Sequence, residues 1–551
     1  MKSRYKSTEV QILVLIAIFV TLAATPFSNK DSLIIPKIIV LFSGAISLLP
    51  RLTLKLRYVK DNKIQSILGI LSILFFLQLL IVMVISSAPA EQQIFGRTGR
   101  GIGFVTWVSC LLILLLSASF SQIGNIHHIH FGLTLTGVIT AVYAICQSFG
   151  FDFFPWDSKT NGVISTLGNP NFVSGFIAMS FIPSLIFFGF KKYKTYIKVI
   201  LIILYCFAIY RAESLQGYIG IFLSAIIYLL VYLWYKNKSL FICLSTISVS
   251  GLVVLALSSL NKGPLSSYLY KISVQSRGDF WRSAMNTSND HKLFGVGLDS
   301  FGDYYLKYRD IVAVNHPWAE YTDSAHNYFL ELLVSGGYPL LILYTSILLL
   351  TLWSFLSAFR INTEFKPLLG ALFSAYLVFQ AQALISPISI PILVWSSIIS
   401  GAIIGVYSST FDKTTVEINS VSQATARLRK TGIGLLVVGL VALYPLFNVD
   451  RLQFNAMKNG DGDLAVLSTK KFPESVVRYS TMTRELLKSG LNIQALDLAR
   501  SAVKFNPNSP GLWVLIMINP TAPIEERILA KQKMQELDPL NQDILNFEIT
   551  N

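Results

Sequence analysis

Apolar runs of about the length that crosses a lipid bilayer recur along most of this sequence. A membrane-spanning helix needs about 20 mostly apolar residues, because lipid offers no hydrogen bonds to an unpaired backbone. Thirteen such runs occur, near residues 10–25, 34–49, 64–88, 102–120, 130–149, 172–190, 196–211, 216–235, 240–260, 327–358, 366–386, 390–409 and 431–447. The pattern predicts an all-α polytopic membrane protein with 12 or 13 transmembrane helices.

The composition supports this class and argues against several others. Hydrophobic residues make up 53% of the chain and charged residues only 14%, whereas a soluble domain is about 25% charged. The net charge is +15, but the basic residues are spread over several short loops rather than gathered on one face, so nucleic acid is not an expected partner. The four cysteines lie inside apolar runs without a CxxC or Cys/His pattern, which predicts neither a disulfide framework nor a zinc site.

The distribution of lysine and arginine predicts the orientation. The loops at 51–63 and 413–430 carry several lysines and arginines and the loop at 191–198 carries four lysines, whereas the short loops that alternate with them hold few basic residues. Short cytoplasmic loops carry an excess of positive charge, so the N-terminus is predicted to be cytoplasmic. The long polar loop at 261–326 and everything after about residue 447 are then extracytoplasmic.

The chain therefore divides into a predicted transmembrane domain, 1–447, and a polar, helical C-terminal domain, 448–551. In the second domain Ala495 and Ala502 are seven residues apart and a proline follows five residues later, a spacing typical of the second helix of a tetratricopeptide repeat. A second, weaker copy ends near Pro539. We expect a tetratricopeptide-like domain, which offers a possible binding surface for a protein partner.

His326 is a candidate general base in the 261–326 loop. It directly precedes Asn327 and an apolar run, and Asp323 or Ser324 is positioned to cap the helix that begins there. The positive end of a helix dipole lowers the pKa of an imidazole, and a neutral imidazole can accept a proton. The competing interpretation is a histidine that merely anchors the membrane interface.

Arg277 is a candidate phosphate ligand in the same loop. Ser276 and Asp279 resemble a capping box, which predicts a helix that starts there and places Arg277 and Trp281 on one face. The arginine fork donates two hydrogen bonds at once to a phosphate group. An interfacial arginine that contacts lipid headgroups is an equally good interpretation of this pattern.

Other polar residues at the same predicted side of the membrane are weaker candidates. Asn169 and Asn171 flank a proline at the mouth of a span, where their amides can bind sugar hydroxyls, although a simple turn explains them locally. Arg211 and Glu213 lie at the end of another span and can form an ion pair. The histidines at 127, 128 and 130 are predicted to be cytoplasmic, so we expect no metal site and no cofactor.

Taken in order, these motifs resemble a known family. The succession G-N-P-N, S-R-x-x-x-W, G-V-G-x-x-x-F and A-H-N-x-x-L is similar to that of the O-antigen ligase and O-antigen polymerase superfamily, which includes bacterial protein O-oligosaccharyltransferases. The resemblance covers about residues 160–400 and is strongest between 276 and 339.

The resemblance implies a bacterial inner-membrane glycosyltransferase of the GT-C type, surrounded by membrane lipids. Such enzymes take a glycan from an undecaprenyl-diphosphate carrier and attach it to a lipid, glycan or protein acceptor, with inversion and without metal. The family's loop histidine corresponds to His326 and its loop arginine to Arg277. Leu215 stands where a second arginine is expected, so Arg211 is the substitute. The remaining substrate-binding residues implied are Asn169, Asn171, Trp281 and Asn327.

Other function classes remain open at this point. Within the family the chain can be a ligase, a protein-glycosylating enzyme or a polymerase. A lipid-linked-glycan transporter is a further alternative, although the sequence shows no internal repeat and its charges gather at the predicted outer mouth. A scaffold that recruits partners through its C-terminal repeats does not account for the arginine and histidine of the loop.

Overall fold

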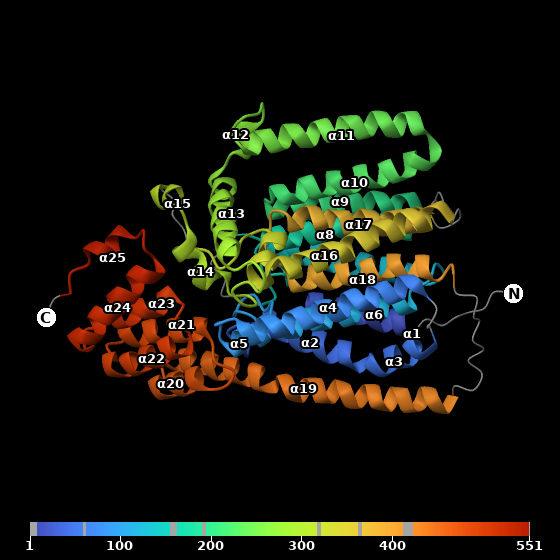
Figure 1. Cartoon of the computed structure of the whole chain (residues 1–551). Helices are drawn as coiled ribbons and strands as arrows, with labels where there is room; N and C mark the ends of the chain where they lie inside the picture. Colours follow the sequence, from blue (N-terminus) through green and yellow to red (C-terminus); the bar gives the residue numbers. More distant parts are fainter. Residues whose placement is uncertain are drawn as a thin grey trace.

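The computed structural model describes residues 8–58, 62–154, 162–189, 194–316, 321–361, 366–411 and 422–549. Throughout these residues the only regular secondary structure is helical. Most helices run side by side in one bundle, and a separate group of short helices lies beyond one end of it (Figure 1). The predicted all-α architecture is confirmed.

Each of the thirteen predicted spans coincides with a helix. These helices are α1 (Thr8–Leu22), α2 (Ile34–Ser47), α4 (Lys63–Ile85), α6 (Phe104–Phe120), α7 (His127–Ser148), α8 (Pro170–Phe187), α9 (Thr195–Ala212), α10 (Leu215–Lys236), α11 (Lys238–Ser259), α16 (Tyr328–Ile361), α17 (Lys366–Ala383), α18 (Ile390–Ser408) and α19 (Ser422–Asn459). Within the described ranges, ten helices are long and apolar enough to cross a membrane. Of the others, α1 and α6 are shorter, and α17 carries two glutamines. Two short helices, α3 (Leu49–Tyr58) and α5 (Ala90–Phe95), complete this region.

Buried polar contacts join the helices at the centre of the bundle. The most completely buried helix is α18, whose Trp395 donates a hydrogen bond of 3.0 Å to Thr21 of α1. Ser117 of α6 donates to the carbonyl of Ile398 at 2.7 Å. Such bonds between helices add to close packing in lipid, where burying apolar surface does not by itself favour association.

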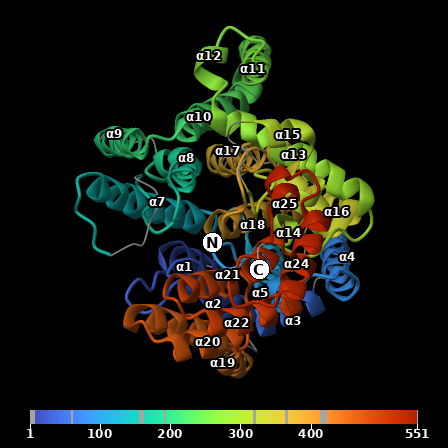
Figure 2. The ribbon, with the colours of Figure 1, turned by 90° about the vertical axis from the view of Figure 1, so that its left-hand side faces the viewer.

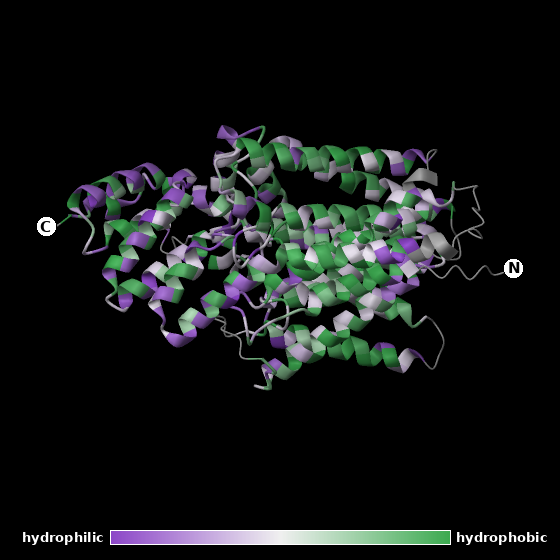
Figure 3. Cartoon of the chain, turned by 90° about the horizontal axis from the view of Figure 1, so that it is seen from below, coloured by the Kyte–Doolittle hydropathy of each residue, from purple (hydrophilic) through white to green (hydrophobic). Residues whose placement is uncertain are grey.

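The exterior of the bundle is apolar, as expected for a surface that faces lipid. Hydrophobic residues cover the bundle, and hydrophilic residues concentrate in the group of helices at its far end (Figure 3). The outermost helix is α11, which has almost no buried residue and exposes Ile242, Val249 and Leu252. So many exposed apolar side chains on one surface indicate that lipid surrounds it.

The 261–326 loop is folded rather than extended. It contains α12 (Ser266–Leu269), α13 (Ile272–Asp290), α14 (Phe301–Tyr308) and α15 (Ile311–Asn315). The axis of α13 lies across the end of the bundle rather than along the spanning helices (Figure 1). The end of the bundle that carries this loop is called the loop end below.

The predicted capping box at Ser276 is wrong. The amides of Val274 and Gln275 already bond to the carbonyl of Lys271, so α13 begins one turn earlier and Ser276 is a buried residue inside it. The side chain of Asp279 pairs instead with Arg282 and His316.

The C-terminal domain is a group of short helices with its own core. The helices are α20 (Gly462–Lys470), α21 (Val476–Lys488), α22 (Asn492–Phe505), α23 (Pro510–Met517), α24 (Ile524–Leu537) and α25 (Gln542–Asn546). Neighbours α21 and α22 pack as a pair, and so do α23 and α24. Ala495 and Ala502 are fully buried, as their spacing predicted. The tetratricopeptide assignment itself stays a prediction.

A single long helix connects the two domains. The predicted boundary at 447 falls inside α19, which continues from the bundle to Asn459. Seen from the loop end, the C-terminal helices lie in front of the bundle (Figure 2). They also contact the 261–326 loop: Arg309 donates to both carboxylate oxygens of Asp538, at 2.7 and 3.0 Å, and Asn506 donates to Asp303 at 2.9 Å. The loop and the C-terminal domain therefore lie at the same end of the bundle.

Candidate functional site

Two glycines fix the position of the loop against α16. Gly295 and Gly337 both have a positive φ, 62° and 72°, and the second interrupts α16. The amide of Val296 bonds to the carbonyl of Val334 at 2.8 Å, and the amide of Tyr338 bonds to the carbonyl of Lys292 at 2.8 Å. A Cβ atom on Gly295 would lie 2.3 Å from the carbonyl oxygen of Val334, a distance that no side chain tolerates. The glycine-rich turn thus allows one backbone to approach another.

His326 lies immediately before α16 with a left-handed backbone, φ 50°. The cap of this helix is Asn327, whose side-chain oxygen accepts from the amides of Phe329 and Leu330 at 3.0 and 3.1 Å. The predicted caps, Asp323 and Ser324, are therefore wrong. Ser324 is already engaged, since its hydroxyl accepts from the amide of His326 and donates to Glu331.

Arg277 points its guanidinium at backbone carbonyls. Its Nε donates to Ile385 at 2.8 Å, and another of its nitrogens donates to the carbonyl of Ser273. No described carboxylate lies within ion-pair distance of it. Burial lowers the pKa of Arg277 from its usual value, as expected for a cation that lacks an opposite charge.

His326 is held neutral by its surroundings. Burial lowers its pKa, the positive charges of Arg277 and Arg100 lower it further, and Asp323 opposes them, which together bring the pKa to about 4. The ring of Phe280 packs on the imidazole at 5.4 Å between centroids. The predicted direction of the shift is right, but burial and two arginines cause it. The structure thus brings Arg277 and His326 together.

Arg100 was not among the predicted site residues. It bonds to Asp299 and Glu331, each at 2.7 Å, and lies 3.6 Å from Asp323. Burial opposes the charge of Arg100, but these carboxylates raise its pKa above the usual value. The same arginine holds the pKa of Asp323 below its usual range against the effect of burial.

Arg97 belongs to the same network, which reaches the C-terminal domain. It pairs with Asp303 at 3.1 Å and donates to the hydroxyl of Tyr321 at 2.9 Å. Asp303 is also the residue that receives the hydrogen bond from Asn506. One signal in the sequence pointed to this network: two arginines stand close together in a short loop where the charge distribution predicts few.

The asparagines predicted to bind sugar lie at the start of α8, near the segment that Arg277 contacts. Asn169 caps α8 by accepting from the amide of Asn171 at 2.8 Å, as the turn interpretation expected. The side chain of Asn171 accepts from Ser214 at 2.7 Å, and its carbonyl accepts from Gln382 at 3.1 Å. The segment that carries Gln382 continues to Ile385, the carbonyl that Arg277 binds. Asn171 and Arg277 therefore contact the same short segment.

Arg211 is engaged elsewhere. Its nitrogens donate to the hydroxyl and the carbonyl of Ser148 at 2.9 and 2.6 Å, and its guanidinium lies 5.1 Å from the ring centroid of Phe149. Among the described residues it pairs with no carboxylate, Glu213 included. Within the described ranges its contacts are with Ser148 and Phe149, not with Arg277 or His326.

Trp281 offers an unused donor one turn from Arg277. Its indole nitrogen is buried and has no hydrogen-bond partner in the described part of the chain. A buried polar group without a partner calls for an explanation, and a bound substrate is one. The two residues are four apart on α13 and so share a face, as predicted.

The histidine cluster at 127–130 belongs to the other end of the bundle. His130 is buried, and its two ring nitrogens lie 3.2 and 3.1 Å from the carbonyls of Pro183 and Leu368. His128 contacts Gln11 at 3.2 Å. In the described ranges no group of three or more histidine, cysteine or acidic side chains is arranged to hold a metal ion.

A comparison with known families matches the segment that contains this site. Residues 200–345 fit a family model described as O-antigen ligase. No curated protein matches the chain. The matched segment runs from α9 into α16 and includes both Arg277 and His326. It supports a membrane enzyme of the O-antigen ligase and polymerase superfamily, for which a glycan donor and an acceptor are the general substrates.

Proposed function

We propose that this protein is a membrane glycosyltransferase of the O-antigen ligase type. It would transfer a glycan from an undecaprenyl-diphosphate carrier to an acceptor hydroxyl on the outer face of the bacterial cytoplasmic membrane. One observation carries the proposal: Arg277, a partly buried arginine that has no carboxylate partner among the described residues, lies close enough to the neutral His326 to lower its pKa. A cation in this state is suited to an anionic group, and a neutral imidazole to a hydroxyl.

The reaction is a single displacement at the anomeric carbon of the donor. The acceptor oxygen forms a bond to this carbon while the bond to the phosphate oxygen breaks, and undecaprenyl diphosphate leaves with the electron pair. The proton of the acceptor passes to His326 and then to solvent. Attack from the face opposite the leaving group inverts the configuration. Arg277 stabilises the charge that grows on the diphosphate, as a preorganised cation does.

Donor binding strengthens the base in this scheme. In the free protein the charge of Arg277 contributes to the low pKa of His326, about 4. A diphosphate placed against Arg277 offsets that charge, so the pKa of His326 rises toward its ordinary value. The histidine becomes a better proton acceptor only when the donor is in place. Arg277 supplies positive charge where other transferases use a metal ion, which supports a metal-independent reaction.

The orientation and the acceptor are part of the same proposal. The loop end faces away from the cytoplasm, because the loops rich in lysine and arginine lie at the opposite end. The acceptor is a hydroxyl on a lipid, a glycan or a protein, and a polymerase would use a second copy of the glycan. The C-terminal helices at the loop end are placed to meet a protein acceptor or partner.

The test is a transfer assay with purified protein. An undecaprenyl-diphosphate oligosaccharide and host envelope extract are incubated in EDTA without nucleotide, with the wild type, His326→Ala and His316→Ala. We expect release of undecaprenyl diphosphate by the wild type and by His316→Ala, and none by His326→Ala. His316 is a matched control because it lies in the same loop and contacts Asp279. Full release by His326→Ala would contradict the mechanism, and no release by the wild type would favour transport.

A further inference from the structure

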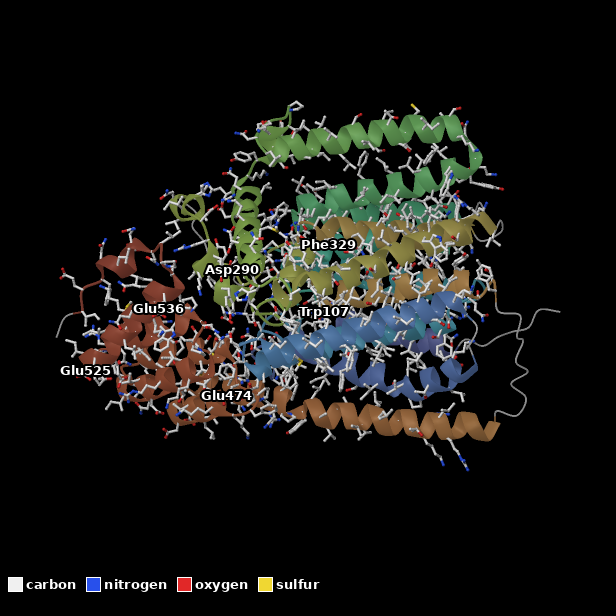
Figure 4. All side chains as sticks on the ribbon, viewed as in Figure 1. Trp107, Asp290, Phe329, Glu474, Glu525 and Glu536 are labelled. Atoms are coloured by element: carbon white, nitrogen blue, oxygen red, sulfur yellow. The ribbon has the colours of Figure 1, made fainter. Side chains whose placement is uncertain are left out.

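A cleft with both polar and apolar lining opens at the loop end, at the far end of α13 from Arg277. Its volume is about 590 Å³, and its walls are the end of α4 with the two serines that follow it, the end of α13, residues 291–296 and Tyr304. Asp290 marks the last residue of α13, and Phe329 lies in the first turn of α16 (Figure 4). A pocket of this size is in the range that holds a small organic ligand.

The C-terminal domain bounds the cleft on one side. Asn508 donates to the hydroxyl of Ser87 at 3.0 Å and to the hydroxyl of Tyr304 at 3.3 Å. The hydroxyls of Ser87 and Tyr304 also lie 3.0 Å from each other. Both side chains line the cleft, so the domain fixes its rim.

The lining carries the functional groups that bind sugar. Asn289, Asp290 and Lys292 are exposed side chains that offer amide, carboxylate and ammonium groups to a ligand. The rings of His291 and Tyr304 meet edge to face at 5.8 Å and present aromatic surface beside them. The hydroxyls of a sugar can bond to the three polar side chains, while the C–H face of the sugar packs on the two aromatic rings.

The charge of the cleft argues against a phosphate ligand. The charged side chains of the lining itself are one carboxylate, Asp290, and one ammonium, Lys292. Burial lowers the pKa of His291, Asp290 raises it and nearby Lys307 lowers it, and the net decrease favours the neutral ring near pH 7. The Arg277 site, by contrast, holds a cation that pairs with no carboxylate in the part of the chain that the structure describes. The cleft therefore suits an uncharged, hydroxyl-rich ligand rather than a diphosphate.

The distance between Arg277 and the cleft decides how long a glycan must be to reach both. Twelve residues separate Arg277 from Asn289 along α13, which is about 18 Å at the rise of an α-helix. A single sugar held at the reacting centre cannot reach so far, but a chain of several sugars can. We propose that this cleft is a glycan subsite that binds sugars remote from the reacting end of an oligosaccharide. The proposal rests on the proposed function, since it places the reaction at Arg277 and His326.

The test measures how binding depends on glycan length. The probes are fluorescent oligosaccharides of increasing length, made by partial acid hydrolysis of host envelope polysaccharide, and the proteins are the wild type, Asn289→Trp and Asn286→Trp. Asn289→Trp places a large side chain in the cleft, whereas Asn286 is an exposed asparagine one turn back on α13, outside it. We expect Asn289→Trp to weaken binding of the longest chains about tenfold, the loss of about one to two hydrogen bonds, and to leave the shortest unchanged. Asn286→Trp should follow the wild type.

Equal affinity of Asn289→Trp and the wild type for every length would overturn the subsite. Competition with unlabelled glycans, from the lipid-linked donor in one arm and from the acceptor fraction in the other, shows which substrate occupies it. Binding is read without turnover, so the two proposals fail separately. Length-dependent binding without any transfer would reject the glycosyltransferase alone, and transfer without a length effect in Asn289→Trp would reject the subsite alone.

Discussion

Two arginines of the loop end, Arg277 and Arg100, both contribute to the low pKa of His326, yet their surroundings differ. Arg100 is tied to buried carboxylates, with Asp299 and Glu331 each at 2.7 Å. Arg277 bonds only to backbone carbonyls among the described residues, and its charge is not balanced by a described carboxylate.

The difference separates a structural cation from a binding one. The charge of Arg100 is balanced by buried carboxylates, although its Nη1 has no hydrogen-bond partner in the described part of the chain. Removing Arg100 would leave those carboxylates without their cation. A buried arginine without a carboxylate is costly to keep unless an anion arrives during function. The comparison predicts that Arg100 acts on folding and Arg277 on donor binding.

Among the variants that test this difference between Arg100 and Arg277, the largest expected effect is the loss of stability in Arg100→Gln. Two buried carboxylates then lack their partner, which costs about 3–5 kcal/mol of unfolding free energy. Denaturant unfolding in detergent measures this change. Arg500→Gln is the control, because Arg500 is exposed and pairs with the half-buried Glu526 at the surface, and such pairs are worth about 1 kcal/mol or less. Equal stability of the two variants would remove the structural role of Arg100.

Next in size is the loss of turnover in Arg277→Gln. Removing one preorganised charge from a developing anion lowers the rate about 10²–10³-fold, or about 3–4 kcal/mol. Arg277→Lys keeps the charge but loses the fork, so it should remain severely impaired. Arg282→Lys, on the same helix and paired with Asp310, is the matched control and should turn over normally. Normal rates in Arg277→Lys would favour a lipid-headgroup contact.

A smaller effect is expected on the pH profile. His326 must be neutral to accept a proton, so activity falls as pH drops below its pKa, which is about 4 in the free protein. Replacing Arg277 with glutamine removes a positive charge, so the pKa rises and the acid limb of kcat/KM moves to higher pH. In the wild type the acid limb of kcat should lie above that of kcat/KM, because bound diphosphate offsets Arg277. If the acid limb of kcat/KM lay at the same pH in the wild type and in Arg277→Gln, the charge of Arg277 would not control the pKa of His326.

The smallest effect belongs to Arg211→Gln. The guanidinium already contacts Ser148 and Phe149, so we expect a loss of turnover of about tenfold or less, the size of one ordinary hydrogen bond. A loss as large as that of Arg277→Gln would establish Arg211 as the second diphosphate contact. Transfer rates of the two variants, measured with one donor preparation, decide the point.

The sequence predicted what depends on local chemistry. The helices at the thirteen predicted spans were predictable because a transmembrane helix is specified by the length and apolarity of its own residues, and ten of them in the described ranges are long and apolar enough to cross a membrane. Ala495 and Ala502 were predictable because their spacing places both on one helix face. His326 and Arg277 were selected through motif order and the chemistry of their side chains; the structure places them together, and their catalytic roles stay predictions.

The residues that were missed depend on contacts between distant segments. Arg100 lies about 200 residues from Asp299 in the sequence, and the residues around Arg100 do not identify Asp299 as its partner. The caps expected at Ser276 and Ser324 failed for a similar reason: the backbone around Lys271 starts α13 early, and Glu331 and His326 occupy the Ser324 hydroxyl. The engagement of Arg211 with Ser148 was likewise invisible in the sequence.

Affinity for undecaprenyl diphosphate tests the central claim most directly, because it needs no knowledge of the acceptor. The ligand is titrated in EDTA against purified wild type, Arg277→Gln and Arg282→Gln. The account predicts that Arg277→Gln binds at least about tenfold more weakly, since a charge-assisted phosphate contact is worth roughly 1.5–3 kcal/mol. Arg282→Gln should match the wild type. Equal affinity in all three proteins would contradict the claim that Arg277 receives the diphosphate.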